Sequence, residues 1–260
     1  MPYECETELM LSAARQAGEV ALRHFHAGTV TEEKADHSPV TAADRECERL
    51  ICELLSAAFP GDGILGEEGA ARPSHSGRRW LIDPIDGTRD FVRRNSFWSV
   101  QIALEDEGKI VLGAIFLPCL NEMLHATSGV GCYWNGTRTS AAATTSLDKA
   151  VLMLSGLKSA GTVWAPDAVR RLTEICWTVR GYGAGYDMIM LARGCADIWL
   201  SGSGMEWDYA PARIIAQELG AKFLTRDGTG RINAQHCLIC LPGLERELRS
   251  ILQMPNQGAI

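Results

Sequence analysis

The 260-residue sequence contains no run of about 18 consecutive apolar residues, the length that a membrane-spanning helix needs. It also has little positive charge: 25 lysines and arginines face 32 aspartates and glutamates, a net charge of −7 at pH 7. An acidic surface repels a phosphate backbone, and the arginine pairs are too scattered to form a basic groove. Residues 1–8 lack the basic and then apolar order of a secretory signal. We therefore expect no membrane span, no signal peptide and no nucleic-acid partner.

The composition is otherwise that of a globular protein. The chain is 46% hydrophobic and 22% charged by residue, which excludes a disordered or a fibrous protein. Its nine cysteines are odd in number, dispersed and mostly placed in apolar runs. Cys237 and Cys240 form a single Cys-x₂-Cys pair, so a buried strand is favoured over a zinc site. Reduced thiols that fill a core predict a cytoplasmic protein.

Hydrophobic periodicity in the first half predicts two helices followed by antiparallel strands. Apolar residues recur at helical spacing over residues 6–25, and Thr41 is a good N-cap for a second helix that ends at residues 60–63. Residues 80–83 form an apolar run that stops at a carboxylate. Further strands are expected at residues 96–104, 110–117 and 122–127.

The second half alternates between strands and helices. The expected elements are, in order, a strand over residues 151–155, a helix from Pro166, a strand near Thr178, a helix over 188–192, a strand over 196–200, a helix over 207–219 capped by Gly220, and strands at 223–224 and 237–241. Residues 140–146, rich in small polar side chains, mark the expected junction between an N-terminal α+β half (residues 1–145) and a C-terminal α/β half (residues 146–260). The pattern predicts a layered, mixed α/β fold.

The most informative segment is Asp83-Pro84-Ile85-Asp86-Gly87-Thr88. Two carboxylates three residues apart at the end of a buried strand are costly to desolvate unless a cation lies between them. Gly87 and Thr88 then open an expected helix over residues 88–93, whose free N–H groups favour an anion. An Asp-Pro or Asp-Gly pair alone is ordinary turn chemistry. Together, however, the two carboxylates, the threonine and the buried strand indicate a metal-bridged phosphoester site.

Two further acidic positions have both a structural and a functional interpretation. Glu67 follows the strand-like Ile64-Leu65, where acids usually belong to a solvated loop. If that strand lies next to residues 80–83, however, the carboxylate of Glu67 falls beside Asp83. Asp208 stands at the start of a long apolar helix, where an N-cap is the simpler interpretation.

These motifs resemble those of the inositol monophosphatase family. The similar segments are Gly66-Glu67-Glu68, residues 80–88, Trp207-Asp208 with its helix ending at Gly220, and the upstream Pro39-Val40-Thr41-Ala42-Ala43-Asp44. They cover nearly the whole chain in the right order. The resemblance implies a layered αβαβα sandwich, an α/β (α+β) fold of the inositol monophosphatase/fructose-bisphosphatase type, with one cleft shared by the two halves.

The resemblance also implies a metal site. Two or three Mg²⁺ ions are expected per active site, and Li⁺ is expected to compete at the position held by Asp86 and Asp208. The expected metal ligands are Glu67, Asp83, the main-chain carbonyl of Ile85, Asp86 and Asp208. A metal-activated water would attack phosphorus, and Glu67 or a Thr88–Asp44 pair would remove its proton and orient it.

Four of the implied positions have particular roles or alternatives. The amides of Gly87 and Thr88 would hold the phosphate oxygens. Asp44 also fits the first turn of a helix, where an acid is favourable without any catalytic role. Lys34 resembles a basic residue that precedes the upstream motif in relatives, and a solvated loop lysine is an equal alternative.

The leaving group is expected to contact the second half of the chain. In relatives, the glycine-rich turn, here residues 181–186, and an acid seven residues before the Trp-Asp aspartate contact substrate hydroxyls. The implied substrate-binding positions are Gly183, Ala184, Ser201 and Asp208, in addition to Gly87 and Thr88. Ser201 replaces that acid, and Ala184 replaces an Asp of the histidinol-phosphate branch, although the turn spacing is closer to that branch. These departures leave the phosphatase chemistry intact and both substrates open.

The predicted function is Mg²⁺-dependent hydrolysis of a small phosphorylated metabolite, similar to inositol monophosphate or to histidinol phosphate, by a cytoplasmic homodimer. Sugar bisphosphates and 3′-phosphorylated nucleotides are the alternative substrates. A non-catalytic metal-dependent binding or regulatory module is the alternative of another class. Retention of Asp44 and Thr88, which a pure binder does not need, favours the enzyme.

Overall fold

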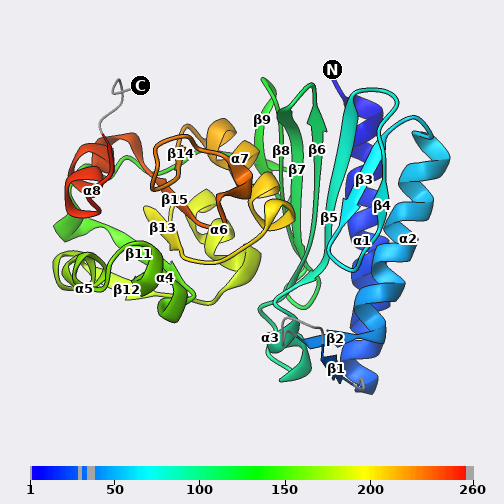
Figure 1. Cartoon of the computed structure of the whole chain (residues 1–260), viewed down its shortest axis with the longest axis horizontal. Helices are drawn as coiled ribbons and strands as arrows, with labels where there is room; N and C mark the ends of the chain where they lie inside the picture. Colours follow the sequence, from blue (N-terminus) through cyan, green and yellow to red (C-terminus); the bar gives the residue numbers. More distant parts are fainter. Residues whose placement is uncertain (1, 29–30, 34–38, 256–260) are drawn as a thin grey trace.

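The computed structural model describes residues 2–28, 31–33 and 39–255 and arranges them in five layers (Figure 1). An eight-stranded sheet and a five-stranded sheet are separated by two helices, and further helices cover the outer face of each sheet. The predicted αβαβα sandwich is therefore confirmed. Within the described residues, no helix combines the length and the apolar character needed to cross a membrane.

The first layer contains α1 (Glu4–Ala27) and α2 (Ala42–Ala58), which pack on the eight-stranded sheet. Small residues on the buried face of α1 allow a close approach, and the ring of Phe116 fills the space beside Gly18. Thr41 caps α2 as predicted, because its hydroxyl accepts the N–H of Ala43 at 3.2 Å. A two-stranded ribbon of β1 (Thr31–Glu33) and β2 (Pro39–Thr41) leads into α2.

The eight-stranded sheet has the order β10-β9-β8-β7-β6-β5-β3-β4. Its strands are β3 (Gly63–Gly66), β4 (Ala71–Arg72), β5 (Arg78–Asp86), β6 (Ser99–Asp106), β7 (Lys109–Leu117), β8 (Glu122–Thr127), β9 (Gly131–Trp134) and β10 (Thr137–Thr139). Strand β5 pairs in parallel with β3 and antiparallel with β6. The side chains of β7 alternate between the two faces of the sheet and contribute to two hydrophobic cores. Leu112 and Ala114 pack in the core beneath α1 and α2, and Ile115 packs in the core beneath α7.

The five-stranded sheet has the order β12-β11-β13-β15-β14. Its strands are β11 (Val151–Ser155), β12 (Thr178–Arg180), β13 (Ile198–Ser201), β14 (Lys222–Leu224) and β15 (Cys237–Cys240). Between the sheets lie α6 (Ala184–Ala192) and α7 (Glu206–Leu219), and the outer layer contains α4 (Leu157–Val163), α5 (Pro166–Ile175) and α8 (Glu245–Ile251). The chain leaves the first sheet at Thr139 and enters the second at Val151, while a division at residue 145 stays a prediction.

Helix α7 packs directly on the eight-stranded sheet at Gly113. A Cβ at this position would lie 2.6 Å from Ile214 Cγ2 and 2.7 Å from Pro211 Cα. The contact depends on glycine because one of the two partners is helix backbone. At the other end, α7 stops at Gly220, which adopts the left-handed conformation (φ 80°) as the sequence predicts.

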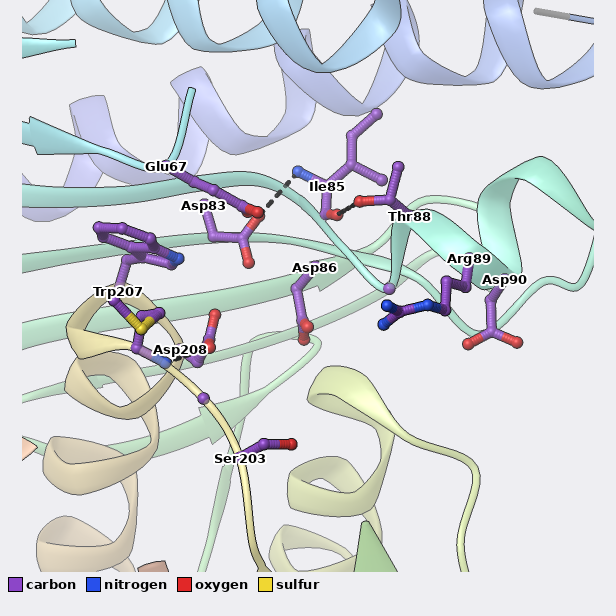
Figure 2. A pocket seen from close by; sticks show the side chains of 13 residues that line it. Glu67, Asp83, Ile85, Asp86, Thr88, Arg89, Asp90, Ser203, Trp207 and Asp208 are labelled. Carbon is purple, nitrogen blue, oxygen red and sulfur yellow. Dashed lines mark hydrogen bonds between the residues drawn. The ribbon is translucent and has the colours of Figure 1, made fainter. Parts of the chain in front are cut away.

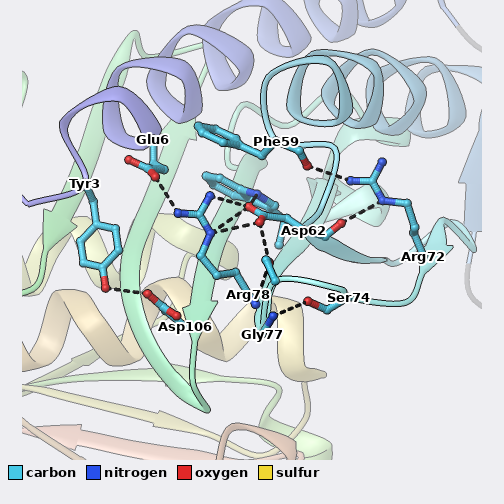
Figure 3. Close-up of polar contacts among 11 residues, drawn as sticks. Tyr3, Glu6, Phe59, Asp62, Arg72, Ser74, Gly77, Arg78 and Asp106 are labelled. Carbon is cyan, nitrogen blue, oxygen red and sulfur yellow. Dashed lines mark hydrogen bonds and ion pairs between the residues drawn. The ribbon is translucent and has the colours of Figure 1, made fainter.

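A partly buried ion-pair network joins α1 to the end of the eight-stranded sheet where β5 begins (Figure 3). The carboxylate of Asp62 accepts hydrogen bonds from Arg78 at 2.7 Å, Ser76 at 2.8 Å and the indole of Trp80 at 3.0 Å. Arg78 also donates to Glu6 of α1 at 2.7 Å. Burial raises the pKa of Asp62, but these hydrogen bonds outweigh it and hold the pKa below its usual range. The network stabilises the end of the sheet remote from the cavity described below.

Several elements have bounds or types that differ from the expectations. The helix expected over residues 188–192 begins at Ala184, and the strand expected over residues 196–200 spans Ile198–Ser201. The β9–β10 hairpin, α4 and α8 were not predicted, because their short segments carry little periodicity. All nine cysteines are free thiols, and Cys237 and Cys240 are buried in β15, as expected for a core strand.

Candidate active site

A cavity of about 440 Å³ opens where the end of β5, the short helix α3 (Thr88–Val92) and the start of α7 meet (Figure 2). The lining residues are Glu67, Asp83, Ile85, Asp86, Gly87, Thr88, Arg89, Asp90, Ser203, Gly204, Met205, Trp207 and Asp208. Among these described lining residues, Arg89 is the one with a basic side chain. An acidic cavity of this kind accepts an anionic ester when bound cations reverse its sign.

A bulge at the end of β5 turns Asp83 and Asp86 toward the same cavity. Asp83 pairs with Gln101 of β6, and Asp86 pairs with Ser99, so three steps along β5 match two along β6. In a regular strand, side chains three positions apart point to opposite faces of the sheet. The extra residue reverses this alternation, and Pro84, which has no N–H to pair, lies within the bulge. The N–H of Ile85 donates to Asp83 Oδ1 at 3.0 Å and holds that carboxylate in place.

Glu67 reaches Asp83 because β3 and β5 are adjacent and parallel. The functional interpretation of Glu67 required that its strand lie next to residues 80–83, and it does. Gly66 lies opposite Ile82, and the N–H of Glu67 donates to the carbonyl of Ile82 at 3.1 Å. The side chain of Glu67 therefore lies beside Asp83 on the cavity wall (Figure 2).

Asp44 and Asp208 occupy the same position, N3, in two different helices. Asp44 Oδ2 accepts the N–H of Thr41 at 2.8 Å and its hydroxyl at 2.6 Å at the start of α2. Asp208 Oδ2 accepts the N–H of Met205 at 2.6 Å at the start of α7. The simpler interpretation of Asp208 as an N-cap is thus three residues off, since Met205 is the N-cap and Asp208 is at N3. Both aspartates stabilise a helix start and still have an oxygen directed elsewhere.

Thr88 links the cavity wall to the buried carboxylate of Asp44. Gly87, just before it, has a φ of 91°, and a Cβ there would lie 3.2 Å from the carbonyl of Phe97, so the turn needs glycine. Thr88 Oγ1 lies 3.2 Å from the carbonyl oxygen of Ile85 and 3.5 Å from Asp44 Oδ1. Its one proton can serve either acceptor, which leaves its oxygen able to accept from a molecule in the cavity.

The carboxylates of Asp83, Asp86 and Asp208 form a cluster in which one oxygen of each lies within 4.8 Å of the others. Burial and the charges of Glu67 and the other two aspartates raise the pKa of Asp83 well above its usual range, and burial with the charge of Asp208 does the same for Asp86. Burial also raises the pKa of Asp208, to about 6. Crowded oxygen donors with excess negative charge fit a hard divalent cation such as Mg²⁺.

Two polar residues of β6 that were not predicted as site residues form hydrogen bonds with the carboxylate of Asp86. Gln101 donates its side-chain N–H to Asp86 Oδ2, and Ser99 Oγ lies 3.4 Å from the same oxygen. Both side chains are buried. A polar pair at alternate positions of an otherwise apolar strand is the sequence signal that could have identified them.

Of the predicted substrate-binding positions, Asp208, Gly87 and Thr88 line the cavity, whereas Gly183, Ala184 and Ser201 are not among its described lining residues. Ser201 is buried, donates to the carbonyl of Ser203 at 3.1 Å and pairs with the hydroxyl of Tyr209 at 2.9 Å. Gly183 lies near the cavity rim, because a Cβ there would be 4.0 Å from Asp90 Oδ2, and Ala184 begins α6. The substrate contacts of these residues stay predictions, and Lys34 lies outside the described residues.

The wall facing the carboxylates was not anticipated from the sequence. It consists of Arg89 and Asp90 of α3 and of the segment Ser203–Met205 before α7. This segment is held close to α7, since a Cβ on Gly204 would lie 2.6 Å from the ring of Tyr209. The sequence does not reveal this wall, because α3 and the segment before α7 lie far apart in the chain.

Comparison with known proteins agrees with this geometry. The model of the inositol monophosphatase family matches residues 3–253. The chain belongs to the inositol monophosphatase family. A histidinol-phosphatase of Chlorobaculum parvum is 34% identical over 241 residues, which cover 90% of this chain and 93% of the relative. An inositol-1-monophosphatase of Bacillus subtilis is 31% identical over 225 residues, which cover 82% of this chain and 83% of the relative.

A solved structure also shares the fold of this chain. The crystal structure of the extragenic suppressor protein suhB from Bartonella henselae superposes on this chain with a TM-score of 0.89 and 27% sequence identity. The match covers 99% of this chain and 100% of that one. The family and its phosphatase relatives identify the protein as a phosphoric monoester hydrolase. The alternative of a non-catalytic binding module is set aside on this ground.

Proposed function

We propose that this phosphatase requires Mg²⁺ and hydrolyses the monoester of a small phosphorylated metabolite of the inositol monophosphate or histidinol phosphate kind. The observation that carries the proposal is the convergence of Asp83, Asp86 and Asp208, whose oxygens lie within 4.8 Å of one another in the cavity. The two kinds of substrate follow the names of the relatives, a histidinol-phosphatase and an inositol-1-monophosphatase.

The residues present fit two or three Mg²⁺ ions per site. Their proposed ligands are Glu67, Asp83, the carbonyl oxygen of Ile85, Asp86 and Asp208. When bound, Mg²⁺ would supply a water of lowered pKa and positive charge for the phosphate. Burial and repulsion between the carboxylates raise the pKa of Asp83 and of Asp86, and a divalent cation would offset both effects. We also propose that Li⁺ competes at the position shared by Asp86 and Asp208.

The proton and the phosphate are handled by residues of the cavity wall. The Thr88 hydroxyl, linked to Asp44 Oδ1 at 3.5 Å, is placed to orient an attacking water and to pass its proton toward Asp44. Glu67 is the alternative acceptor for that proton. The amides of Gly87 and Thr88 are proposed to donate to the phosphate oxygens, because this turn lines the cavity.

The leaving group would lie against Arg89, Asp90 and the Ser203–Met205 segment, which line the same cavity. This wall combines a cation, an anion and a hydroxyl, which suits a polar alcohol better than an apolar one. Gly183, Ala184 and Ser201 are proposed to shape this wall, with Ser201 acting through its bond to Ser203. A cytoplasmic homodimer is the proposed assembly, and light scattering of the purified protein tests the dimer.

The test measures phosphate release from a panel of esters, including inositol monophosphate, histidinol phosphate, a sugar bisphosphate and a 3′-phosphonucleotide. We expect turnover with Mg²⁺, none after chelation, and a loss of at least about 100-fold in Asp86→Asn. Asp167→Asn is the matched control, because this side chain of α5 is 97% exposed. Activity that survives chelation or the Asp86 substitution contradicts the metal mechanism, whereas turnover of only the sugar or nucleotide esters contradicts the substrate class.

A further inference from the structure

Glu48 is a buried carboxylate in α2 that the proposed mechanism does not use. Its side chain is 5% exposed, and it does not belong to the described residues that line the active-site cavity. It follows Asp44 by four positions, so both acids lie on the same face of α2. Burying a second carboxylate on that face is costly unless its oxygens are hydrogen-bonded.

Both oxygens of Glu48 accept backbone N–H groups from the loop that contains Glu67. Oε2 accepts the N–H of Glu68 at 2.8 Å, and Oε1 accepts the N–H of Ala70 at 2.9 Å. The backbone of Gly66 also packs on this carboxylate, because a Cβ there would collide with Oε2. The carboxylate thus contacts the chain on both sides of Glu67.

Two more backbone donors of this loop are used elsewhere. The N–H of Gly66 donates to the carbonyl of Ala70 at 2.7 Å, and the N–H of Glu67 donates to the carbonyl of Ile82 at 3.1 Å. One side of the loop is therefore fixed to β5, and the other side is fixed to Glu48. Glu67 is held between these attachments and points at the carboxylate cluster (Figure 2).

A charged carboxylate suits this position for a chemical reason. Two N–H donors converge on it, and a carboxylate offers one acceptor oxygen to each. A glutamine of the same size offers one oxygen and one NH₂ group, so one loop N–H would face another donor. The loop would then move to relieve that contact, and Glu67 would move with it.

We propose that Glu48 is a positioning residue: it holds the 66–70 loop so that Glu67 is presented to the divalent cation, and it thereby sets metal affinity. The inference rests on the proposed function, since it assumes that Glu67 binds the metal. Residues that support a metal ligand typically change metal affinity by about 10–100-fold when they are replaced.

The experiment measures Mg²⁺ binding to the metal-stripped protein by calorimetry, together with kcat and the Mg²⁺ concentration for half-maximal activity. We expect Glu48→Gln to weaken Mg²⁺ binding by about 10–100-fold while kcat at saturating Mg²⁺ stays within about threefold. Leu55→Ala, a buried change two turns along α2, should lower the melting temperature but leave Mg²⁺ affinity unchanged. Equal shifts of affinity in both variants would reduce Glu48 to a purely structural role.

A double-mutant cycle with Glu67→Gln shows whether Glu48 acts through Glu67. We expect Glu48→Gln to add little to the affinity loss of Glu67→Gln, because the ligand that it positions is already gone. Fully additive losses would overturn the inference. Should Glu48→Gln fail to fold, Gly66→Ala tests the same contact from the loop side and must also weaken Mg²⁺ binding.

The two proposals fail in different ways. If the wild-type protein binds Mg²⁺ but releases phosphate from no ester, the proposed function fails, while the calorimetric comparison still decides the role of Glu48. If turnover is normal and Glu48→Gln binds Mg²⁺ like the wild type, the inference about Glu48 alone is wrong.

Discussion

Replacing Asp208 with asparagine should stabilise the metal-free protein and abolish the stabilisation by Mg²⁺. Asp208 is one of three carboxylates whose oxygens lie within 4.8 Å of each other, and burial raises its pKa from 3.8 to about 6. The folded state therefore has to tolerate an unfavourable charge at neutral pH. Asparagine removes that charge and can keep the hydrogen bond from the Met205 N–H.

The magnitude follows from the two pKa values. Each pKa unit corresponds to about 1.4 kcal/mol, so the charged form of Asp208 costs about 3 kcal/mol at pH 7. Asparagine offers one acceptor oxygen where the carboxyl group offers two, and this offsets about 1 kcal/mol of the gain. The net gain of about 2 kcal/mol corresponds to a rise of about 4–8 °C in melting temperature for a chain of this length.

The pH dependence has a definite sign. Between about pH 4 and pH 6 the folded carboxyl of Asp208 still holds its proton while the unfolded one has lost it, so the penalty grows as the pH rises. The advantage of Asp208→Asn should therefore be complete at pH 7 and absent near pH 3.5. With Mg²⁺ at 100 times its dissociation constant, the wild type gains about 2.7 kcal/mol, and the order of stability reverses.

Calorimetric melting of both proteins, with chelator and with Mg²⁺, provides the measurement. Asp167→Asn, at an exposed position of α5, is the control and should change stability by less than about 0.5 kcal/mol. If metal-free Asp208→Asn melts at or below the wild type at pH 7, or if its advantage persists unchanged at pH 3.5, the buried charge of Asp208 does not destabilise the metal-free protein.

Three more outcomes are expected. Asp62→Asn should lose about 2 kcal/mol in urea unfolding at pH 7, because the ion pair with Arg78 is lost and Glu6 alone remains as a carboxylate partner of Arg78, and the loss should shrink as the pH falls from about 4 toward the lowered pKa of Asp62. Gly113→Ala should cost about 1–3 kcal/mol by the same measurement, since its Cβ would press on α7, whereas Gly161→Ala in α4 has open space and should be neutral or slightly stabilising. Mg²⁺ affinity, followed by calorimetry, should fall as the pH drops through about 6, because protons compete with the metal for Asp208.

The chemistry of the site was more predictable than its geometry. The Asp83–Thr88 segment, Glu67 and Asp208 were identified from residue types and from the family resemblance, and all of these positions except Pro84 line one cavity. That Asp83 and Asp86 point the same way could not be read from their spacing. It depends on a bulge against β6, which becomes visible only when the two strands are paired.

Residues that act through others were not predicted, because their signal is a contact between distant segments. Glu48 looks like an ordinary helix-surface acid until α2 packs over the 66–70 loop. Gln101 looks like a polar interruption of a strand until Asp86 is placed beside it. Ser201 was chosen by counting back from Asp208, and its hydroxyl contacts with Ser203 and Tyr209 could not be read from that count.

The structural and catalytic interpretations of Asp44 and Asp208 do not compete. Each aspartate is at N3 of its helix and accepts an N–H from the residue that caps it, so each is fixed by the helix start. The two helices, α2 and α7, pack on opposite faces of the eight-stranded sheet, and both contact β5 (Figure 1). Since β5 ends in Asp83 and Asp86, the two helix starts bring their aspartates to the same strand end from opposite sides. Helix capping thereby supplies part of the rigidity that a site of crowded carboxylates requires.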